Sequence, residues 1–571
     1  MTKLLQSLLP VNSRQYREET SQRIAWGHWF ALFNIVLALL ISSRYAFNAD
    51  WPNTLFGKLY FFISLFGHFS FVVFALYLLL IFPMSFFIQN HRVFRGISVI
   101  MATCGMTILL VDTEVFKRFY LHLSPLVWDL LVNPEEGELA RKWQLLFVPM
   151  PLILLLEMLY SRWCWHKLRS FNRQKWIRPV GLFFLLSFCA THLLYAWADI
   201  SRYRPITAQK ANYPLSYPMT ARTFLEKHGL IEKFQQGQRI ETEGRVDSFF
   251  LNYPKTKLSF NPPASSMNLL IINLSGLNYS LLQSDDMPML QKIQRQSRLF
   301  TQHYTGSDDA AGNIVSLFYG LSGRYLDSIL NEQAQSVLID RLQQLGYQFG
   351  MFSHNGFAEP IYTRSLFSAF NLPKSQSNQQ AIAQWQHWLT TIDAAPFFSY
   401  LDLKLHDDLR QNDQQLHTIW QQLTASDLLR NTLIIFTADI GQISKTANSF
   451  EKSQTQVPLM LYWQGDRGAY TGLSSHLDIV PTLMSQFLGT TSKISDYAQG
   501  IDLTKENNRR WLLSGNYRWN VAIMPNGEQY HINHKGDFLY FNAEEIKQDH
   551  ARPPLALFLS IIQHSNQFVE K

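Results

Sequence analysis

Cysteine is scarce in this sequence and confined to one part of it. Only three of the 571 residues are cysteines, and all of them (Cys104, Cys164 and Cys189) lie in or beside apolar segments of the first third. A disulfide framework therefore cannot support the rest of the chain. Zinc sites built on thiolate ligands are excluded there for the same reason.

The sequence also lacks a concentrated stripe of positive charge. Its formal net charge of +7 is spread along the chain. Because nucleic-acid-binding proteins gather Lys and Arg on one face, this pattern argues against nucleic acid as a partner. Dispersed positive charge does suit contact with anionic phospholipid headgroups. The length of the chain implies at least two domains.

Long apolar runs are abundant in the first third. Most are near the roughly 20 residues that cross a bilayer, so we expect an α-helical membrane domain of five transmembrane helices at residues 1–198. The fourth run is the least regular, because Pro149 and Pro151 interrupt its start and Glu157 lies inside it. The five runs are Ile24–Ser43, Leu59–Phe82, Val93–Val111, Leu145–Tyr160 and Val180–Ala198.

Basic residues predict the orientation of these spans. Lys and Arg collect in the N-terminal segment, in the short loop with Arg92 and Arg95, and in the loop 162–178, whereas the loop 113–142 is rich in acids. The positive-inside rule then places the N-terminus in the cytoplasm. Five crossings place everything after about residue 199 outside, which in a Gram-negative cell is the periplasm.

Three polar residues interrupt the apolar runs. His28, Asn34 and His68 lie within or at the start of spans. Hydrogen bonds to neighbouring helices are the simpler explanation, since such contacts are common in helix bundles. The functional alternative is a polar path or a partner-binding face.

Residues 199–263 form a connector rich in proline and tyrosine, which favours extended segments and turns. It follows the last span, so its cations are expected at headgroup height. Aromatic rings with cations at that depth suit a lipid phosphate, which Arg grips bidentately. An interfacial anchor without lipid preference is the equal alternative. The candidate lipid-binding residues are Arg204, Lys210, Tyr213, Ser216, Tyr217, Met219, Thr220 and Arg222.

Strand and helix patterns alternate from residue 264 to 571, which predicts an α/β domain with a parallel sheet covered by helices on both faces. The expected strands include Leu269–Leu274, Thr432–Thr437 and Val457–Trp463. From Arg509 onward the pattern changes to a small antiparallel meander and a final helix.

Three stretches of this domain resemble motifs of the alkaline-phosphatase/sulfatase superfamily. They are Gln456–Gly465, Ser475–Leu483 and Tyr497–Leu503. The resemblance spans about residues 265–505 and implies a periplasmic domain of sulfatase/alkaline-phosphatase type.

The whole chain resembles one family more closely, the YejM/PbgA inner-membrane proteins of Gram-negative bacteria. The matching runs are Ile24–Asn34, Gly67–Phe71, Tyr203–Thr207, Leu215–Arg222 and Phe224–Gly229. This resemblance implies five spans in the bacterial inner membrane and a role in lipopolysaccharide homeostasis. Members are expected to sense lipid A and, through the LapB adaptor, to restrain FtsH proteolysis of LpxC. Cardiolipin binding or transport has also been proposed for the family.

The catalytic positions of the superfamily are altered here. Phosphoryl or sulfuryl transfer needs a carboxylate-rich metal site and a Ser, Thr or modified Cys nucleophile. The first-strand carboxylate position is Ser275, and the nucleophile position falls at about Asp309 or Ala310. The Asp-His-Gly motif is Asp439-Ile440-Gly441, and the segment before Val457 lacks the histidine that active members use.

These changes favour a catalytically degenerate domain without a cofactor. If the site is active, Thr305, Ser307 or Asp309 are the catalytic candidates. Asp308, Asp309 and Asp439 are the candidate ligands of one divalent metal, Mg, Mn or Zn. The alternative explanation for these residues is that they form turns, since Asp, Ser and Gly dominate turns.

Three functions remain open from the sequence. The first is an inner-membrane lipid A sensor with a membrane-protein partner such as a LapB-like adaptor. The second is a metal-dependent phosphatase or phospholipid headgroup transferase. The third is a lipid transporter. It needs a polar path through the spans, and the sequence shows only scattered polar residues there.

Overall fold

The chain forms two compact units, one from Met1 to Lys233 and one from Phe234 to Glu570. The region 199–263, expected as one connector, is divided between them. The computed structural model describes residues 13–48, 51–125, 127–128, 147–171, 173–220, 240–263, 267–392, 396–442, 448–463, 465–505, 508–533, 536–548 and 553–570.

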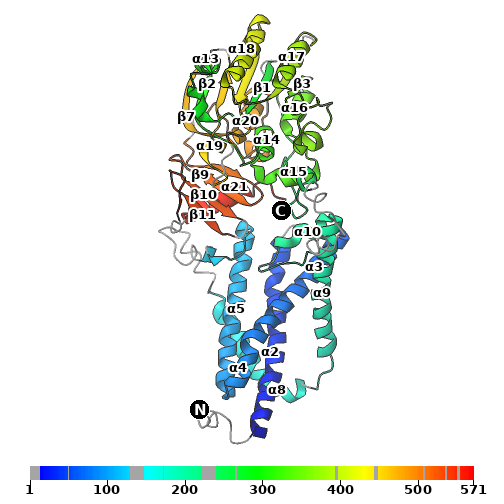
Figure 1. Cartoon of the computed structure of the whole chain (residues 1–571). Helices are drawn as coiled ribbons and strands as arrows, with labels where there is room; N and C mark the ends of the chain where they lie inside the picture. The colour runs from blue at the N-terminus through cyan, green and yellow to red at the C-terminus, as the bar shows by residue number, and fades with distance from the viewer. Residues whose placement is uncertain are drawn as a thin grey trace. The chain divides into compact units, whose positions relative to one another are not determined.

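The first unit is built from long helices (Figure 1). Its elements are α2 (Ser13–Asn48), α3 (Leu55–Leu76), η1 (Tyr77–Ile81), α4 (Phe82–Phe87), α5 (His91–Phe119), α8 (Met150–Phe171), α9 (Ile177–Ser201), α10 (Arg204–Thr207) and η3 (Ala208–Ala211). Within the described residues, α2 packs against α3, α5 and α8, and α9 packs against α3.

Four helices of the described chain are long and apolar enough to cross a membrane, not the five expected. They are Gln15–Asn48, Leu55–Phe87, His91–Arg118 and Ile177–Ser201. The difference is α8, in which Glu157, Arg162 and Lys167 interrupt the apolar sequence. Each such charge is costly at the centre of a bilayer, so composition alone does not make α8 a span.

The contact between α3 and α9 depends on a glycine. A Cβ atom at Gly67 would lie 2.7 Å from the carbonyl oxygen of Ser187 and 2.7 Å from Oγ1 of Thr191. Only glycine permits this approach, as in other close helix pairs of membrane proteins. Nearer the beginning of α3 and the end of α9, Tyr60 and Tyr195 belong to one buried cluster with Ile206 of α10.

The second unit is an α/β domain around a seven-stranded sheet of order β3-β4-β1-β5-β6-β2-β7. The strands are β1 (Asn268–Ser275), β2 (Arg298–Tyr304), β3 (Gln348–Ser353), β4 (Phe397–Lys404), β5 (Thr432–Thr437), β6 (Leu459–Tyr462) and β7 (Gly468–Ser475). The expected α/β class is confirmed, but the sheet is mixed, because β6 is antiparallel to β5 and β2. The link between β5 and β6 holds only the four-residue α19 (Lys452–Thr455) in its described part. A parallel neighbour needs a crossover that carries the chain back across the sheet, usually a helix.

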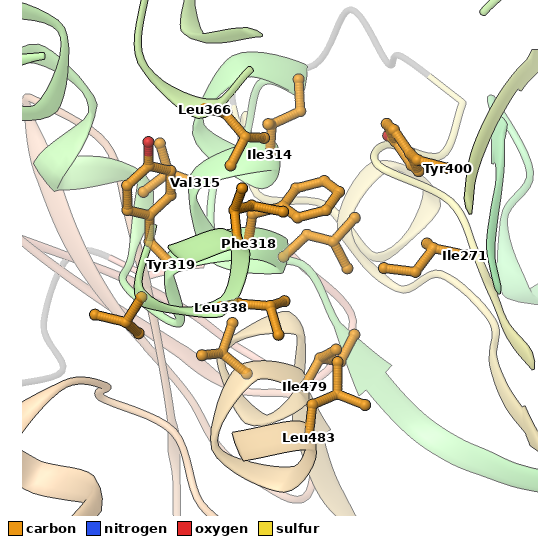
Figure 2. Packing of buried hydrophobic residues seen from close by; sticks show 14 of the residues in the cluster. Ile271, Ile314, Val315, Phe318, Tyr319, Leu338, Leu366, Tyr400, Ile479 and Leu483 are labelled. Carbon is orange, nitrogen blue, oxygen red and sulfur yellow. The ribbon is translucent and has the colours of Figure 1, made fainter. Parts of the chain in front are cut away.

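Two hydrophobic cores cover the two faces of this sheet. Alternate residues of β1 divide between them: Leu269 and Ile271 face one core, and Leu270 and Ile272 face the other. Phe318 of α14 lies among the side chains of the first core (Figure 2). Helices α14, α15, α16 and α20 pack in that core, and α13, α17 and α18 pack in the other. Both faces are therefore buried, and the polar groups gather at the strand ends.

The helical elements of this unit connect the strands. They are η4 (Tyr279–Gln283), α13 (Pro288–Gln296), α14 (Ala310–Tyr319), η5 (Gly323–Tyr325), α15 (Leu326–Glu332), α16 (Val337–Gln344), η6 (Tyr362–Leu366), α17 (Asn378–Leu389), α18 (Leu409–Ala425), η7 (Leu428–Arg430), η8 (His476–Asp478), α20 (Ile479–Thr482), η9 (Leu483–Phe487), η10 (Ile494–Asp496) and α21 (Leu555–Ser565).

The expected C-terminal meander is present as a second, five-stranded antiparallel sheet. Its strands are β8 (Leu512–Gly515), β9 (Trp519–Ile523), β10 (Gln529–Asn533), β11 (Phe538–Phe541) and β12 (Lys547–Gln548). The final helix α21 packs against β8 and β9.

Candidate functional site

Polar side chains meet at the carboxyl ends of three neighbouring strands of the large sheet. Asn273 of β1, Asp402 of β4 and Ser353 of β3 are aligned by the strand register. Asn273 Nδ2 donates to Asp402 Oδ1 at 2.8 Å, and Ser353 Oγ donates to Asp402 Oδ2 at 2.7 Å. In open α/β sheets this edge is where ligands bind. Here both carboxylate oxygens of Asp402 are already held by protein groups.

Asp439 joins this network from the loop after β5. Its backbone N–H donates to Asn273 Oδ1 at 2.6 Å, and its Oδ1 accepts from the Ile440 N–H at 2.9 Å. Side-chain hydrogen bonds from Ser275 and Asn273 also favour its charged form. The predicted carboxylate of the Asp-Ile-Gly motif thus lies beside the first strand, as the sequence motif indicates.

Burial dominates the titration of both carboxyl groups. It raises the pKa of Asp402 to about 6, against hydrogen bonds from Ser353 and Asn273 that lower it. Burial and the nearby Asp402 charge raise the pKa of Asp439 to about 6. Two buried acids that repel each other share their protons near neutral pH.

Sequence reasoning missed three members of this network. Asn273 and Asp402 lie within apolar runs that were interpreted only as buried strands, and Ser353 directly follows a third such run. The available signal was the polar residue in or directly after each run, because a buried polar side chain needs a partner. Nearby, His354 Nδ1 lies 3.7 Å from Asp402 Oδ2, and burial lowers the pKa of His354.

The predicted nucleophile loop lies before α14. Thr305 and Ser307 are buried, and Thr305 Oγ1 donates to the Ser307 carbonyl oxygen at 2.8 Å. Asp309 is the N-cap of α14, with its Oδ1 accepting from the Gly312 N–H at 2.5 Å. The residue at the expected nucleophile position therefore accepts a hydrogen bond and caps a helix. This role corresponds to the turn-forming alternative.

The three candidate metal ligands do not form one donor set. Both carboxylate oxygens of Asp308 accept from Asn516 Nδ2, at 3.0 and 2.9 Å. Asp309 caps α14, and Asp439 belongs to the Asn273 network. Among the described residues, no three His, Cys, Asp or Glu side chains are grouped closely enough to hold a metal ion. The residues present thus do not fit the carboxylate-rich metal centre that the sulfatase fold implies.

Two buried histidines form a separate chain of hydrogen bonds. His303 Nε2 and His476 Nδ1 are 2.8 Å apart, and His476 Nε2 contacts the Ala438 carbonyl oxygen at 3.0 Å. Burial lowers the pKa of His476 to about 4. Both ring nitrogens of His476 thus have hydrogen-bonding partners inside the domain.

The second candidate site is the segment 204–220 of the helical unit, named here the strap. Its backbone is held by side chains from the helices. His68 Nε2 of α3 lies 2.8 Å from the Pro214 carbonyl oxygen, and His192 Nδ1 of α9 accepts from the Met219 N–H at 3.1 Å. Polar residues that interrupt the spans thus fix the course of the strap.

Two further contacts hold the first half of the strap. Gln209 Nε2 donates to the Gly57 carbonyl oxygen at 3.0 Å. His122 Nε2 contacts the Ala211 carbonyl oxygen at 2.9 Å, while its Nδ1 lies 2.8 Å from Asp112 Oδ2.

The predicted lipid-binding residues differ in exposure along the strap. Tyr213 is buried, and its hydroxyl donates to the Phe61 carbonyl oxygen at 3.1 Å. Beyond it, Leu215, Tyr217 and Met219 are 73%, 69% and 59% exposed. Lys210 and Thr220 are exposed, Arg204 and Ser216 are half-buried, and Arg222 lies outside the described residues.

Two family models match separate parts of the chain. A family model described as a domain of unknown function (DUF3413) matches residues 13–260. The sulfatase family model matches residues 403–490, which include part of β4 and the Asp439 loop.

Two relatives match almost the entire chain. An uncharacterized protein of Haemophilus influenzae is 46% identical over 577 residues, covering 98% of each chain. The inner membrane protein YejM of Salmonella typhimurium is 40% identical over 584 residues, covering 98% of this chain and 99% of its own.

Solved structures match about half of the chain at low identity. A protein of the alkaline phosphatase superfamily from Vibrio parahaemolyticus is 16% identical, with a TM-score of 0.43, and covers 55% of this chain and 92% of its own. The lipoteichoic acid synthase LtaP from Listeria monocytogenes is 14% identical, with a TM-score of 0.42, and covers 55% and 94%.

The apolar helices and the sulfatase-like α/β domain together define the class: a helical membrane protein with a domain of sulfatase type. The identity to YejM over nearly the full length then settles the family. The chain belongs to the YejM family of inner membrane proteins.

Proposed function

We propose that this protein senses lipid A in the inner membrane and regulates lipopolysaccharide synthesis through a membrane-protein partner. In this proposal α8 is the fifth crossing, so the N-terminus is cytoplasmic and the α/β domain periplasmic. The strap binds lipid A, and the bound state controls, through a LapB-like adaptor, how fast FtsH degrades LpxC. The shift between bound and free states changes the affinity for the partner.

The observation that carries the proposal is the depth of the strap along the helices. His68 is thirteen residues after the start of α3, which corresponds to about 20 Å, and His192 is nine residues before the end of α9, about 14 Å. The hydrocarbon core of a bilayer is about 30 Å thick. A segment held by these two histidines therefore runs beside the outer half of the spans, where it meets lipid rather than water.

The side chains of the strap suit the headgroup of a lipid and the adjoining part of its acyl chains. Leu215, Tyr217 and Met219 offer apolar and aromatic surface to acyl chains, and Tyr is favoured at the membrane interface. Lys210 and Arg204 lie on the turns that precede them and suit the phosphates of a lipid A headgroup. Lipid A combines these two chemistries.

The sheet edge supports a role for the α/β domain as a scaffold. Ser275 replaces the first carboxylate, Asp309 caps a helix at the nucleophile position, and Asp402 is held by protein groups on both oxygens. This arrangement favours a scaffold that binds a partner, rather than a metal-dependent hydrolase.

Lipid analysis of the purified full chain tests the proposal. The variant Leu215→Ala/Tyr217→Ala should lose most of the lipid A that co-purifies with the wild type, as measured by mass spectrometry after extraction. The matched control, Leu182→Ala/Leu185→Ala, removes two exposed apolar side chains of α9, outside the strap. This variant should retain the co-purifying lipid A. Equal lipid A in all three proteins would remove the proposal. Stoichiometric metal with phosphatase activity that Asp439→Ala abolishes would favour the enzyme instead.

A further inference from the structure

Asn34 of α2 and Glu157 of α8 meet inside the helical unit. Asn34 Nδ2 donates to the Phe30 carbonyl oxygen at 3.0 Å and to Glu157 Oε2 at 3.4 Å. The Glu157 side chain is fully buried, and Asn34 is 4% exposed. An acid inside a helix bundle of a membrane protein marks a functional site unless it is paired.

Each of these side chains has one oxygen without a hydrogen-bond partner among the described residues: Asn34 Oδ1 and Glu157 Oε1. The Asn34 amide cannot gain by turning over, because Oδ1 would then face the Phe30 carbonyl oxygen. If Glu157 is ionised, both orphan atoms are acceptors and neither can satisfy the other. A buried polar atom without a partner is costly, so two on one contact require an explanation.

No cation among the described residues compensates a charge on Glu157. On α2, Arg23 and Arg44 are eleven and ten residues from Asn34, about 16 and 15 Å along the helix. Arg23 donates to the Ser85 and Gln89 carbonyl oxygens, and Arg44 pairs with Glu114 at 2.6 Å.

Among the described residues of the neighbouring elements, no cation pairs with Glu157, and Arg162, five residues after it on α8, is exposed. On α8 itself, the Tyr160 hydroxyl donates to the Trp29 carbonyl oxygen at 3.1 Å, and Cys164 is buried. Arg95, a cation of α5, lies over the Trp165 ring, 4.8 Å from its centroid. An ionised Glu157 would therefore be an isolated charge in an apolar bundle.

We propose that Asn34 and Glu157 form a proton-binding site between α2 and α8. The carboxyl group carries the proton on Oε1 and donates it to Asn34 Oδ1, while Asn34 Nδ2 donates to Oε2. A carboxylic acid and an amide are complementary in this way, and one proton satisfies both orphan atoms. The proton comes from water and returns to water, without any other reactant.

The proton makes the contact between α2 and α8 conditional. With it, the two helices are joined by a reciprocal pair of hydrogen bonds. Without it, an acceptor faces an acceptor and a charge lies among apolar side chains, so the two helices separate or admit water. This inference concerns the helices alone and does not depend on lipid A binding at the strap.

Infrared spectroscopy of the full chain in phosphatidylcholine vesicles tests the site. The difference between the wild-type and Glu157→Gln spectra at pH 7 should contain the carbonyl band of a buried protonated carboxyl group, because any band from Asp402 and Asp439 is common to both proteins and cancels. Glu114→Gln is the matched control, because Glu114 is paired with Arg44 and Arg118 and its difference spectrum should contain no such band. A Glu157→Gln difference spectrum without the band would overturn the proposal.

A stability measurement shows whether the Glu157→Gln variant folds. Glu157→Gln retains one donor and one acceptor in the place of the acid, so it should unfold at the wild-type temperature at pH 7. As the pH rises to 10, the melting temperature of the wild type should fall more than that of Glu157→Gln. Equal pH dependence of the two proteins would contradict a proton at this site. A carboxyl band at pH 7 that disappears on addition of sodium chloride would overturn it in favour of a cation site.

Discussion

The sheet edge and the strap differ in what their side chains contact. At the sheet edge, Asn273, Ser353 and Asp402 satisfy one another, and the network closes within the protein. In the strap, protein side chains hold the backbone, and the side chains of Leu215, Tyr217 and Met219 face outward. Residues that satisfy one another stabilise a fold, whereas residues held in place and left exposed are available to a ligand. The difference locates the proposed function in the strap, although the sulfatase likeness lies in the other unit.

The largest expected effect comes from opening the closed network. Asp402→Ala removes the acceptor of Asn273 Nδ2, whereas Ser353 Oγ keeps Asn355 Oδ1, at 2.7 Å, as an acceptor. A buried donor without a partner costs about 1–3 kcal/mol, so the α/β domain should lose unfolding free energy of this size. Denaturant titration of the full chain in detergent, followed by tryptophan fluorescence, measures this loss. A loss below about 0.5 kcal/mol, the size of an ordinary surface substitution, would show that the network is not closed.

The pH dependence of stability is the next effect. Because burial raises the pKa of Asp402 from 3.8 to about 6, the folded state binds its proton more tightly than the unfolded state. The stability that this carboxyl contributes is therefore present below about pH 4 and is lost as the pH rises to about 6. The unfolding free energy should fall by roughly 1–3 kcal/mol over this interval.

Asp402→Asn is the matched variant for that measurement. Its amide oxygen still accepts from Asn273, and its amide nitrogen can donate to Ser353 Oγ, but it does not titrate. The decline between pH 4 and 6 should be smaller than in the wild type. An identical decline would assign the titration to other groups.

A smaller effect is expected where a single hydrogen bond holds the strap. His68→Phe keeps the ring but removes the donor to the Pro214 carbonyl oxygen, a loss of about 0.5–1.5 kcal/mol. Amide hydrogen exchange within 215–219 should become several-fold faster. His166→Phe, at an exposed position of α8, is the control and should leave that exchange unchanged. Unaltered exchange in His68→Phe would mean that the strap is held by other contacts.

Much of the α/β fold could be predicted from apolar patterning. The expected strand Thr432–Thr437 has the observed bounds, because a strand buried on both faces is apolar throughout. Strands β2 and β7 were missed. β2 contains Gln302 and His303, and β7 is an edge strand with little apolar sequence, so neither shows that pattern.

The site was less predictable than the fold. The changes at Ser275, Asp309 and Ile440 could be found from motifs, because a motif fixes the position of each residue. The partners Asn273 and Ser353 could not, since strand register is a property of the folded sheet and brings together residues far apart in the chain. The course of the strap was likewise hidden, because it depends on two histidines that the sequence shows only as interruptions of spans.

The most direct test compares the two regions in living cells. In a Gram-negative strain that lacks its own YejM protein, the wild-type chain and two variants are produced at equal levels, and LpxC abundance is measured by immunoblot. We predict that Leu215→Ala/Tyr217→Ala alters LpxC abundance as strongly as removing the protein, whereas Asp439→Ala leaves it at the wild-type level. Wild-type LpxC abundance with the strap variant, together with altered LpxC abundance with Asp439→Ala, would contradict the account. That result would assign the function to the sheet edge.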